Sequence, residues 1–370
     1  MNGRDCDARE LAGWLRLLET PGVGREAARR LLGAFGSPEA VLAASIEDRR
    51  QVVSAAAAVA LARPGEHHDA WLSGTLDWLN ADDRRHVLCL GEPDYPPVLL
   101  ETADPPLLLY ASGRLELLRR PSLAMVGSRH ATAQGRENAR TFAAQLGQAG
   151  LTIVSGLALG IDGAAHEGAL DTPGGTIAVV GTGLDQAYPR RHDALSQQIA
   201  EKGLLVSEYS LGTPPLRENF PQRNRIIAGL TRGTLVVEAT LQSGSLITAR
   251  LAAEAGRDVF AMPGSIHSPQ AKGCHALIKQ GAKLVETVQD VLDELGVAPA
   301  PAAPAASAPE PASPPNPLLE AMGHDPIGLD ELVARTGWSA AELNARLLDL
   351  ELAGRVERLP GQRFQRLARA

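Results

Sequence analysis

Five short turns of small residues follow apolar, strand-like runs between positions 124 and 264, and each turn leads toward a helix-like segment. The turns are Gly127-Ser128-Arg129, Ser155-Gly156, Gly181-Thr182-Gly183, Ser243-Gly244-Ser245 and Pro263-Gly264-Ser265. In an alternating β/α chain, such turns fall at the carboxyl edge of one parallel sheet, where helix N-termini direct backbone N–H groups into a crevice. Several phosphate-sized sites in a row favour a polyanion as ligand over a single nucleotide.

Arginine side chains accompany these turns. The planar guanidinium fork of Arg129 suits a phosphate clamp, and the alternative is a salt bridge to Glu238 or Asp162. Arg223 and Arg225 begin a later helix, but residues two positions apart cannot share one helix face. We therefore expect one of them to face the crevice while the other pairs elsewhere. Asn224, which lies between them, is expected to contact a base edge or only the backbone.

Further cations and aromatic rings fall in loops on the same side of the predicted sheet. Arg190 and Arg191 follow the third turn, and they are either crevice cations or ordinary surface residues. Base stacking requires aromatic side chains, which make up only 4% of the chain, yet three of them occupy crevice-side loops: Tyr188, Tyr209 and Phe220. Each of these rings either stacks on a base or anchors its loop.

Three ionisable residues raise the question of catalysis. Asp162 and His166 are four positions apart on a predicted helix and would share a face. They fit an acid/base pair, but an Asp that caps a helix start beside a packed His is the more common arrangement. Glu238 ends a strand, where it would bind a ribose or act as a general base. Without a second placed acid, a nucleophile or a metal cluster, catalysis is the weaker interpretation.

The elements around these residues predict a doubly wound, mainly parallel α/β domain. Strands are expected at His86–Leu90, Pro106–Tyr110, Leu123–Val126, Thr152–Val154, Thr176–Val180, Leu204–Ser207, Thr234–Glu238, Asp258–Ala261 and Lys283–Val285. Helices are expected at Thr132–Ala149, Asp162–Leu170, Ala194–Lys202, Gln222–Leu230, Ser245–Ala255 and Val288–Leu295. Continuously apolar strands indicate a sheet that is covered on both faces. No G-x-G-x-x-G follows a strand, so this is not a standard dinucleotide-binding domain.

The rest of the chain divides into a helical start, a linker and a small terminal unit. Residues 1–82 are predicted to be helical, with a Thr20–Gly24 turn that resembles a helix-hairpin-helix element. A small interaction domain with a glycine turn is the simpler interpretation. Residues 83–296 form the Rossmann-like core, and residues 297–317, nearly all Ala, Pro and Ser, form an extended linker.

Residues 318–370 show a winged-helix pattern. Helices are expected at Leu329–Arg335 and Ser339–Ala353, and a hairpin around Pro360-Gly361. Acidic residues in the second helix favour contact with a protein over reading of a DNA major groove.

Composition restricts the classes of function. The 370 residues carry a formal net charge of −7, so a nucleic-acid site must be a local patch. Three cysteines, Cys6, Cys89 and Cys274, lack metal-ligand spacing and are expected to be free thiols in a reducing compartment. No secretory pattern opens the sequence, and no apolar run reaches membrane-spanning length. We expect a cytoplasmic protein without metal or cofactor.

An ordered set of motifs resembles the DNA-processing protein A (DprA/Smf) family over nearly the whole chain. The motifs are Met125-Val126-Gly127-Ser128-Arg129, Ser155-Gly156-Leu157-Ala158-Leu159-Gly160-Ile161-Asp162, Arg223-Asn224-Arg225-Ile226-Ile227-Ala228-Gly229-Leu230, Ser243-Gly244-Ser245-Leu246-Ile247-Thr248-Ala249, Met262-Pro263-Gly264-Ser265 and Gly273-Cys274-His275-Ala276-Leu277-Ile278. Each motif alone is weak, but their order is specific. Two positions depart from the family pattern, because His192 and His275 stand where Asn is usual.

The resemblance implies a single-stranded DNA-binding protein of bacterial natural transformation that is not an enzyme. Such proteins shield incoming strands, load the recombinase RecA on them, relieve the block by single-strand binding protein, and act as homodimers through an extended Rossmann-like domain. The fold implied is that domain between a SAM-like or helix-hairpin-helix domain and a winged helix. The DNA-contact candidates are Gly127, Ser128, Arg129, Ser155, Gly156, Arg190, Phe220, Arg223, Asn224, Arg225, Ser243, Gly244 and Ser245.

Two other classes of function remain open on the sequence. A nucleotide-hydrolysing enzyme would use Glu238 and Asp162 as its acid/base residues and would turn over a nucleotide monophosphate. A signalling module would bind a small nucleotide in saturable competition with DNA.

Overall fold

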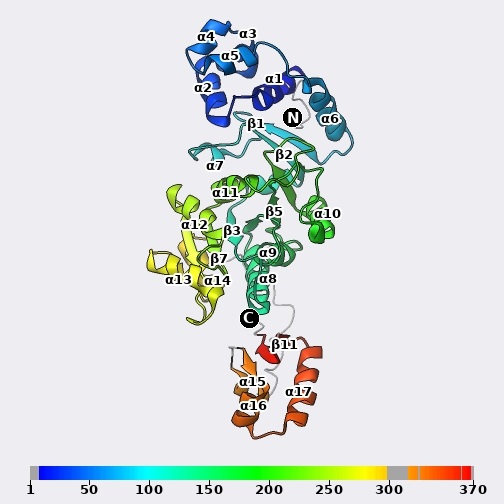
Figure 1. The fold of residues 1–370 in the computed structure, drawn as a ribbon, viewed down its shortest axis with the longest axis vertical. Helices are drawn as coiled ribbons and strands as arrows, with labels where there is room; N and C mark the ends of the chain where they lie inside the picture. Colours follow the sequence, from blue (N-terminus) through cyan, green and yellow to red (C-terminus); the bar gives the residue numbers. More distant parts are fainter. Residues whose placement is uncertain (1–7, 298–315, 324–325, 360, 368–370) are drawn as a thin grey trace.

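A computed structural model describes residues 8–297, 316–323, 326–359 and 361–367 (Figure 1). A helical N-terminal part lies at one end, a large sheet with its helices in the middle and a small α/β unit at the other end. The Ala/Pro-rich segment expected as a linker lies almost wholly outside the described residues, as does Cys6.

The described residues of the N-terminal part, from position 8 on, form six helices. They are α1 (Ala8–Glu19), α2 (Arg25–Phe35), α3 (Pro38–Ala43), α4 (Ile46–Arg50), α5 (Ala55–Ala60) and α6 (His68–Asn80). Serines begin three of them, because the side chains of Ser37, Ser45 and Ser54 each accept a hydrogen bond from a backbone N–H of the first turn. The buried face of α1 packs in one cluster with Val87, Leu108 and other side chains of the first two strands.

A nine-stranded sheet forms the centre of the molecule. Its strands are β1 (Arg85–Cys89), β2 (Leu108–Gly113), β3 (Ser122–Val126), β4 (Thr152–Ser155), β5 (Thr176–Val179), β6 (Leu204–Ser207), β7 (Gly233–Val236), β8 (Asp258–Ala261) and β9 (Lys283–Leu284). The spatial order is β1-β2-β6-β5-β4-β3-β7-β8-β9. In this spatial order, all neighbouring strands from β6 through β5, β4, β3, β7 and β8 to β9 are parallel. The strands β1 and β2 are added antiparallel at the β6 edge. The predicted fold class is confirmed.

Helices cover both faces of this sheet. They are α7 (Pro97–Leu100), α8 (Ala133–Gln148), α9 (Ile161–Ala169), α10 (Asp193–Lys202), α11 (Asn219–Gly229), α12 (Ser245–Glu254), α13 (Lys272–Lys279) and α14 (Val288–Glu294). Side chains alternate along β3, so that Ala124 packs with α11 and α12 while Leu123 packs with α8 and α9. This double cover explains why the strands are apolar at every position.

The strand order reverses beside β3. The chain passes from β3 outward through β4 and β5 to β6, then returns to place β7 on the other side of β3. Connections leave β3 and β7 in opposite directions, so a crevice opens at the carboxyl ends of these two strands. The topology therefore fixes where a ligand site should lie.

The C-terminal unit is a winged helix. It contains α15 (Pro317–Met322), β10 (Ile327–Gly328), α16 (Leu329–Thr336), α17 (Ala340–Leu352), β11 (Val356–Leu359) and β12 (Arg363–Arg366). A capping box between Ser339 and Glu342 begins α17, and Gly337 ends α16 in the left-handed conformation with φ 73°. The two helices and the hairpin predicted here are confirmed. Among the helices that the structure describes, none is long and apolar enough to cross a membrane.

Candidate nucleic-acid interface

A cleft of about 730 Å³ opens at the strand-order reversal. The turn after β3, the start of α11 and the turn before α12 form its walls. Nine of the thirteen residues expected from the sequence line it: Gly127, Ser128, Arg129, Phe220, Arg223, Asn224, Ser243, Gly244 and Ser245. Ser155, Gly156, Arg190 and Arg225 are not among its lining residues.

Arg129 stands exposed over an aromatic pair at the edge of the cleft. Its Cζ lies 5.8 Å from the centroid of the Phe220 ring, and Phe220 in turn lies 5.3 Å from the Tyr188 ring. Tyr188 keeps 44% of its surface exposed. Within the described part of the chain, Arg129 forms no salt bridge, so the alternative pairing with Glu238 or Asp162 is not found. A cation and two rings therefore face solvent together, as phosphate and base contacts require.

Arg223 is buried rather than presented to a ligand. Its Nη1 donates to the carbonyl oxygen of Gly156 at 2.6 Å and to that of Val179. Burial lowers the pKa of Arg223 to about 10, against the opposing effect of the Asp162 carboxylate, so the group remains charged at neutral pH. A Cβ at position 156 would lie 2.3 Å from Nη1, which explains the glycine there. Arg223 thus fastens α11 to the ends of β4 and β5.

The Ser155-Gly156 turn does not offer the free backbone amides that were expected of it. Both the Gly156 and Ala158 N–H groups donate to the Asp162 carboxylate, at 3.1 and 3.3 Å. Burial raises the pKa of Asp162, and the nearby Arg223 charge opposes that rise. The Ser155 hydroxyl is also buried, and it donates to the Met125 carbonyl at 2.6 Å. The hydroxyl of Ser155 and the N–H groups of this turn therefore form hydrogen bonds inside the protein, beneath the cleft.

The other candidates occupy varied places. Asn224 lines the cleft, with its Nδ2 3.5 Å from the Gly244 carbonyl oxygen. The hydroxyls of Ser243 and Ser245 lie 2.7 Å apart at the start of α12. Arg190 is exposed in a short helical turn before α10, and Arg225 forms salt bridges away from the cleft. Of the two arginines on α11, Arg223 therefore faces the cleft and Arg225 pairs elsewhere.

Sequence reasoning missed several lining residues. Arg217 is exposed in the loop before α11 and adds a second outward-facing cation. It precedes Phe220, which lies in the first turn of α11, by three positions, a signal that was available in the sequence. Polar side chains from loops after β3, β7 and β8 complete the lining: His130, Thr240, Gln242 and Gln270.

Leu157, between the cleft and α9, has an unusual backbone conformation. Its φ is 58°, which costs energy for a residue with a branched side chain. The Leu157 N–H donates to Nε2 of His166 at 3.3 Å, and the Leu157 carbonyl lies 3.0 Å from Nδ1 of His192. Nδ1 of His166 lies 2.7 Å from the Thr176 hydroxyl, so both ring nitrogens of this buried side chain have partners. Two histidines hold the strained turn, which agrees with a structural role for His166.

Glu238 also has a structural place. Its two carboxylate oxygens accept hydrogen bonds from the Thr132 N–H at 2.9 Å and from the Thr132 hydroxyl at 2.6 Å, at the start of α8. Burial raises the pKa of Glu238, and the bonds from Thr132 oppose that rise. Across the described residues, no group of three or more His, Cys, Asp or Glu side chains is placed to hold a metal ion.

The fold and cleft define a doubly wound α/β protein with an open cleft at the topological switch point of its sheet. The family model described as DNA recombination-mediator protein A matches residues 86–296, and the DprA winged helix domain matches residues 299–362. The chain therefore belongs to the DNA recombination-mediator protein A family.

Known proteins agree with this assignment. The Smf protein of Escherichia coli (strain K12) is 45% identical over 307 residues, which are 81% of this chain and 82% of that protein. The X-ray structure of DNA processing protein A (DprA) from Streptococcus pneumoniae superposes with a TM-score of 0.68 at 39% identity, covering 78% of this chain and 97% of that one.

A second solved structure concerns the single-stranded DNA binding mode of DNA processing protein A from Helicobacter pylori. It superposes with a TM-score of 0.51 at 32% identity and covers 56% of this chain and 95% of that one.

The buried His166 should make the stability of the core depend on pH. Burial lowers the pKa of His166 from 6.5 to about 3, so below pH 6.5 the unfolded chain takes up a proton that the native state does not. The free energy of unfolding should therefore fall as the pH is lowered from 6.5 to 3, by at most about 1.4 kcal/mol per pH unit. Urea unfolding of the parent and of His166→Gln at several pH values measures how the free energy of unfolding changes with pH. In the variant, the contribution of His166 to this slope should be absent.

The exposed His67→Gln is the control for that measurement and should keep the slope of the parent. An unchanged slope in His166→Gln would show that His166 does not carry the pH dependence.

Proposed function

We propose that the cleft binds single-stranded DNA. The observation that carries this proposal is the grouping of two exposed guanidinium groups, Arg129 and Arg217, with the adjacent, mutually tilted rings of Phe220 and Tyr188. Guanidinium groups neutralise phosphates, and rings accept unpaired bases regardless of sequence. The bases of a duplex are paired and stacked, so the aromatic pair favours a single strand. The relative from Helicobacter pylori, which is described as binding single-stranded DNA, supports this choice.

We further propose that the chain acts as a mediator in natural transformation and recombination, and not as an enzyme. It would protect incoming single strands in the cytoplasm and load RecA on them in the presence of single-strand binding protein. The cleft favours binding over catalysis, because both candidate acid/base residues, Asp162 and Glu238, are engaged with backbone N–H groups. A strand held by local contacts leaves the remaining bases accessible to a recombinase.

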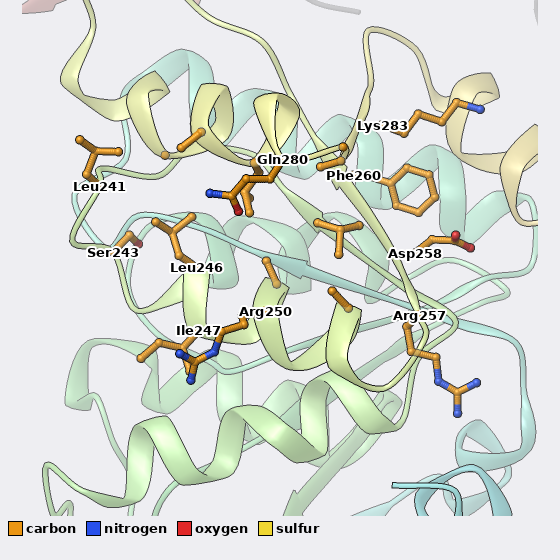
Figure 2. A pocket seen from close by; sticks show the side chains of 18 of the residues that line it. Leu241, Ser243, Leu246, Ile247, Arg250, Arg257, Asp258, Phe260, Gln280 and Lys283 are labelled. Carbon is orange, nitrogen blue, oxygen red and sulfur yellow. The ribbon is translucent and has the colours of Figure 1, made fainter. Parts of the chain in front are cut away.

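The chain is proposed to act as a homodimer through an apolar surface at the β9 edge of the sheet. This edge patch, Leu241, Ile266, Ile278 and Leu284, lines a hollow of about 660 Å³. Ile266 is 67% and Leu241 62% exposed. An adjoining groove of about 800 Å³ is lined by Leu241, Leu246 and Phe260, with Arg250 and Lys283 also on its walls (Figure 2). An open strand edge beside apolar side chains suits a second copy of the same surface.

Removing either exposed arginine should weaken the binding of single-stranded DNA. Arg129→Ala and Arg217→Ala should each cost about 1–2 kcal/mol, because a charge-assisted phosphate contact is lost. Each should also reduce the slope of log Kd against log salt by about 1. Fluorescence anisotropy with a labelled oligonucleotide at several salt concentrations measures both quantities.

Arg119→Ala is the matched control, since Arg119 is exposed and lies outside the residues that line the cleft. Duplex DNA and mononucleotides serve as competitors. Tight mononucleotide binding with little affinity for the oligonucleotide would overturn the proposal and favour the nucleotide enzyme or the signalling module.

Recombinase loading requires its own measurement. The DNA-dependent ATPase of RecA on a strand coated with single-strand binding protein should start sooner when the chain is added. Arg129→Ala should remove most of this effect, because loading depends on holding the strand. If the parent and the variant stimulate the ATPase equally, loading does not depend on strand binding in the cleft.

Charge placed in the edge patch should separate the two copies. Ile266→Glu should shift the mass measured by light scattering from dimer to monomer, because a carboxylate would then have to be buried in an apolar contact. Leu352→Glu makes a similar apolar-to-acidic change on α17, where Leu352 is 80% exposed, and should leave the mass unchanged. A parent chain that is already monomeric at micromolar concentration would contradict the dimer.

A further inference from the structure

A cluster of charged side chains joins the N-terminal helices to α11. This interdomain cluster consists of Arg25 and Arg29 from α2, Asp104 from the loop before β2, Glu208 after β6 and Arg225 from α11. Arg25 lies 3.3 Å from Asp104 and 3.2 Å from Glu208, and its Nη1 donates to the Gln222 side chain of α11 at 3.3 Å. Arg225 lies 3.0 Å from Asp104 and also bonds Glu208.

These groups are largely withdrawn from water. The side chain of Glu208 is 6% exposed and that of Arg225 13%, whereas Asp104, the outermost acid, is 32% exposed. Although burial by itself raises the pKa of Asp104, the charges of Arg225, Arg25 and Arg29 outweigh that effect and lower it. Removing one member of a buried ion pair leaves its partner unpaired, which is more disruptive than loss of a surface pair.

The cluster and the cleft lie on different sides of one helix. Phe220, Arg223 and Asn224 of α11 line the cleft, whereas Gln222 and Arg225 contact the cluster. Arg223 fastens the cleft side of α11 to the ends of β4 and β5, and the cluster fastens the other side to α2. Phe220, whose ring centroid lies 5.8 Å from the Cζ of Arg129, belongs to the helix that both attachments hold.

We propose that Glu208, Asp104 and Arg25 are positioning residues for DNA binding: through α11, the N-terminal helices set the geometry of a cleft that they do not line. This inference rests on the proposed binding of single-stranded DNA. It also gives Arg25 and Arg29 of α2 a role other than phosphate contact, because both are paired with acids. The helix-hairpin-helix-like turn then belongs to a structural connection.

The direction in which one substitution changes the affinity for DNA distinguishes a positioning role from a purely electrostatic one. Glu208→Gln removes a negative charge, which by long-range electrostatics alone would strengthen binding to DNA. Positioning predicts the opposite, a loss of affinity of roughly 2- to 30-fold. The slope of log Kd against log salt should remain that of the parent, because no phosphate contact is removed. Asp104→Asn, at a more exposed position, should act in the same direction.

The experiment measures affinity and salt slope by anisotropy, together with the melting temperature. Glu116→Gln, which breaks an exposed pair with Arg114, is the matched control and should bind like the parent. Arg25→Gln should weaken binding without reducing the salt slope. A double variant, Arg25→Gln with Glu208→Gln, should lose little more than the weaker-binding single variant, because the two residues act as one unit.

Several results would overturn the proposal. Folded Glu208→Gln and Asp104→Asn variants with parental or stronger binding would show that the cluster serves stability alone, whatever their melting temperatures. A salt slope reduced by about 1 in Arg25→Gln would show that α2 contacts phosphate directly. If the parent itself fails to bind single-stranded DNA, the proposed function fails first, an outcome distinct from these.

Discussion

Burial of the Arg223 guanidinium is the constraint on which the rest of the cleft depends. A charged group without solvent must find polar partners inside the protein, and here those partners are the carbonyls of Gly156 and Val179 and the neighbouring charge of Asp162. These hydrogen bonds require a glycine at position 156, because a Cβ there would collide with the guanidinium group. They also require the Asp162 carboxylate, which holds the turn after β4, and a fixed position of α11 against the sheet. The surface features of the cleft follow from this placement, since Phe220 and Asn224 belong to the same helix.

Local charge matters more here than the charge of the whole chain. The formal net charge is −7, yet the cleft presents Arg129 and Arg217 to solvent while its acid, Asp162, is turned to the backbone below. Some arginines outside the cleft are paired with acids, such as Arg25 and Arg225 with Asp104 and Glu208. Under the proposed function, this local pair of cations would attract a nucleic acid to the cleft although the net charge of the chain is negative.

Much of the fold could be predicted from the sequence, because the parallel strands are apolar at every position and end in small-residue turns. The helix α13 (Lys272–Lys279) was not expected, since Gly273 and Cys274 give little helical signal and its place is set by packing of Cys274 under α12 and the sheet. The site was harder to predict. Sequence spacing indicated that Arg223 and Arg225 must diverge, but it could not show that the crevice-facing one is buried. That outcome depends on carbonyls contributed by β4 and β5, which lie far away in the sequence.

The small number of outward-facing cations in the cleft has a kinetic consequence. Under the proposed function, two guanidinium groups would release few counterions when a strand binds. One cleft would then hold its strand for a shorter time than a protein that encloses the backbone in a long basic channel. Two linked clefts would counter this loss through effective concentration, because a strand released by one remains close to the other. A protein with two such clefts would keep the strand bound most of the time while it repeatedly releases each segment. Another protein could then bind the released segments one after another.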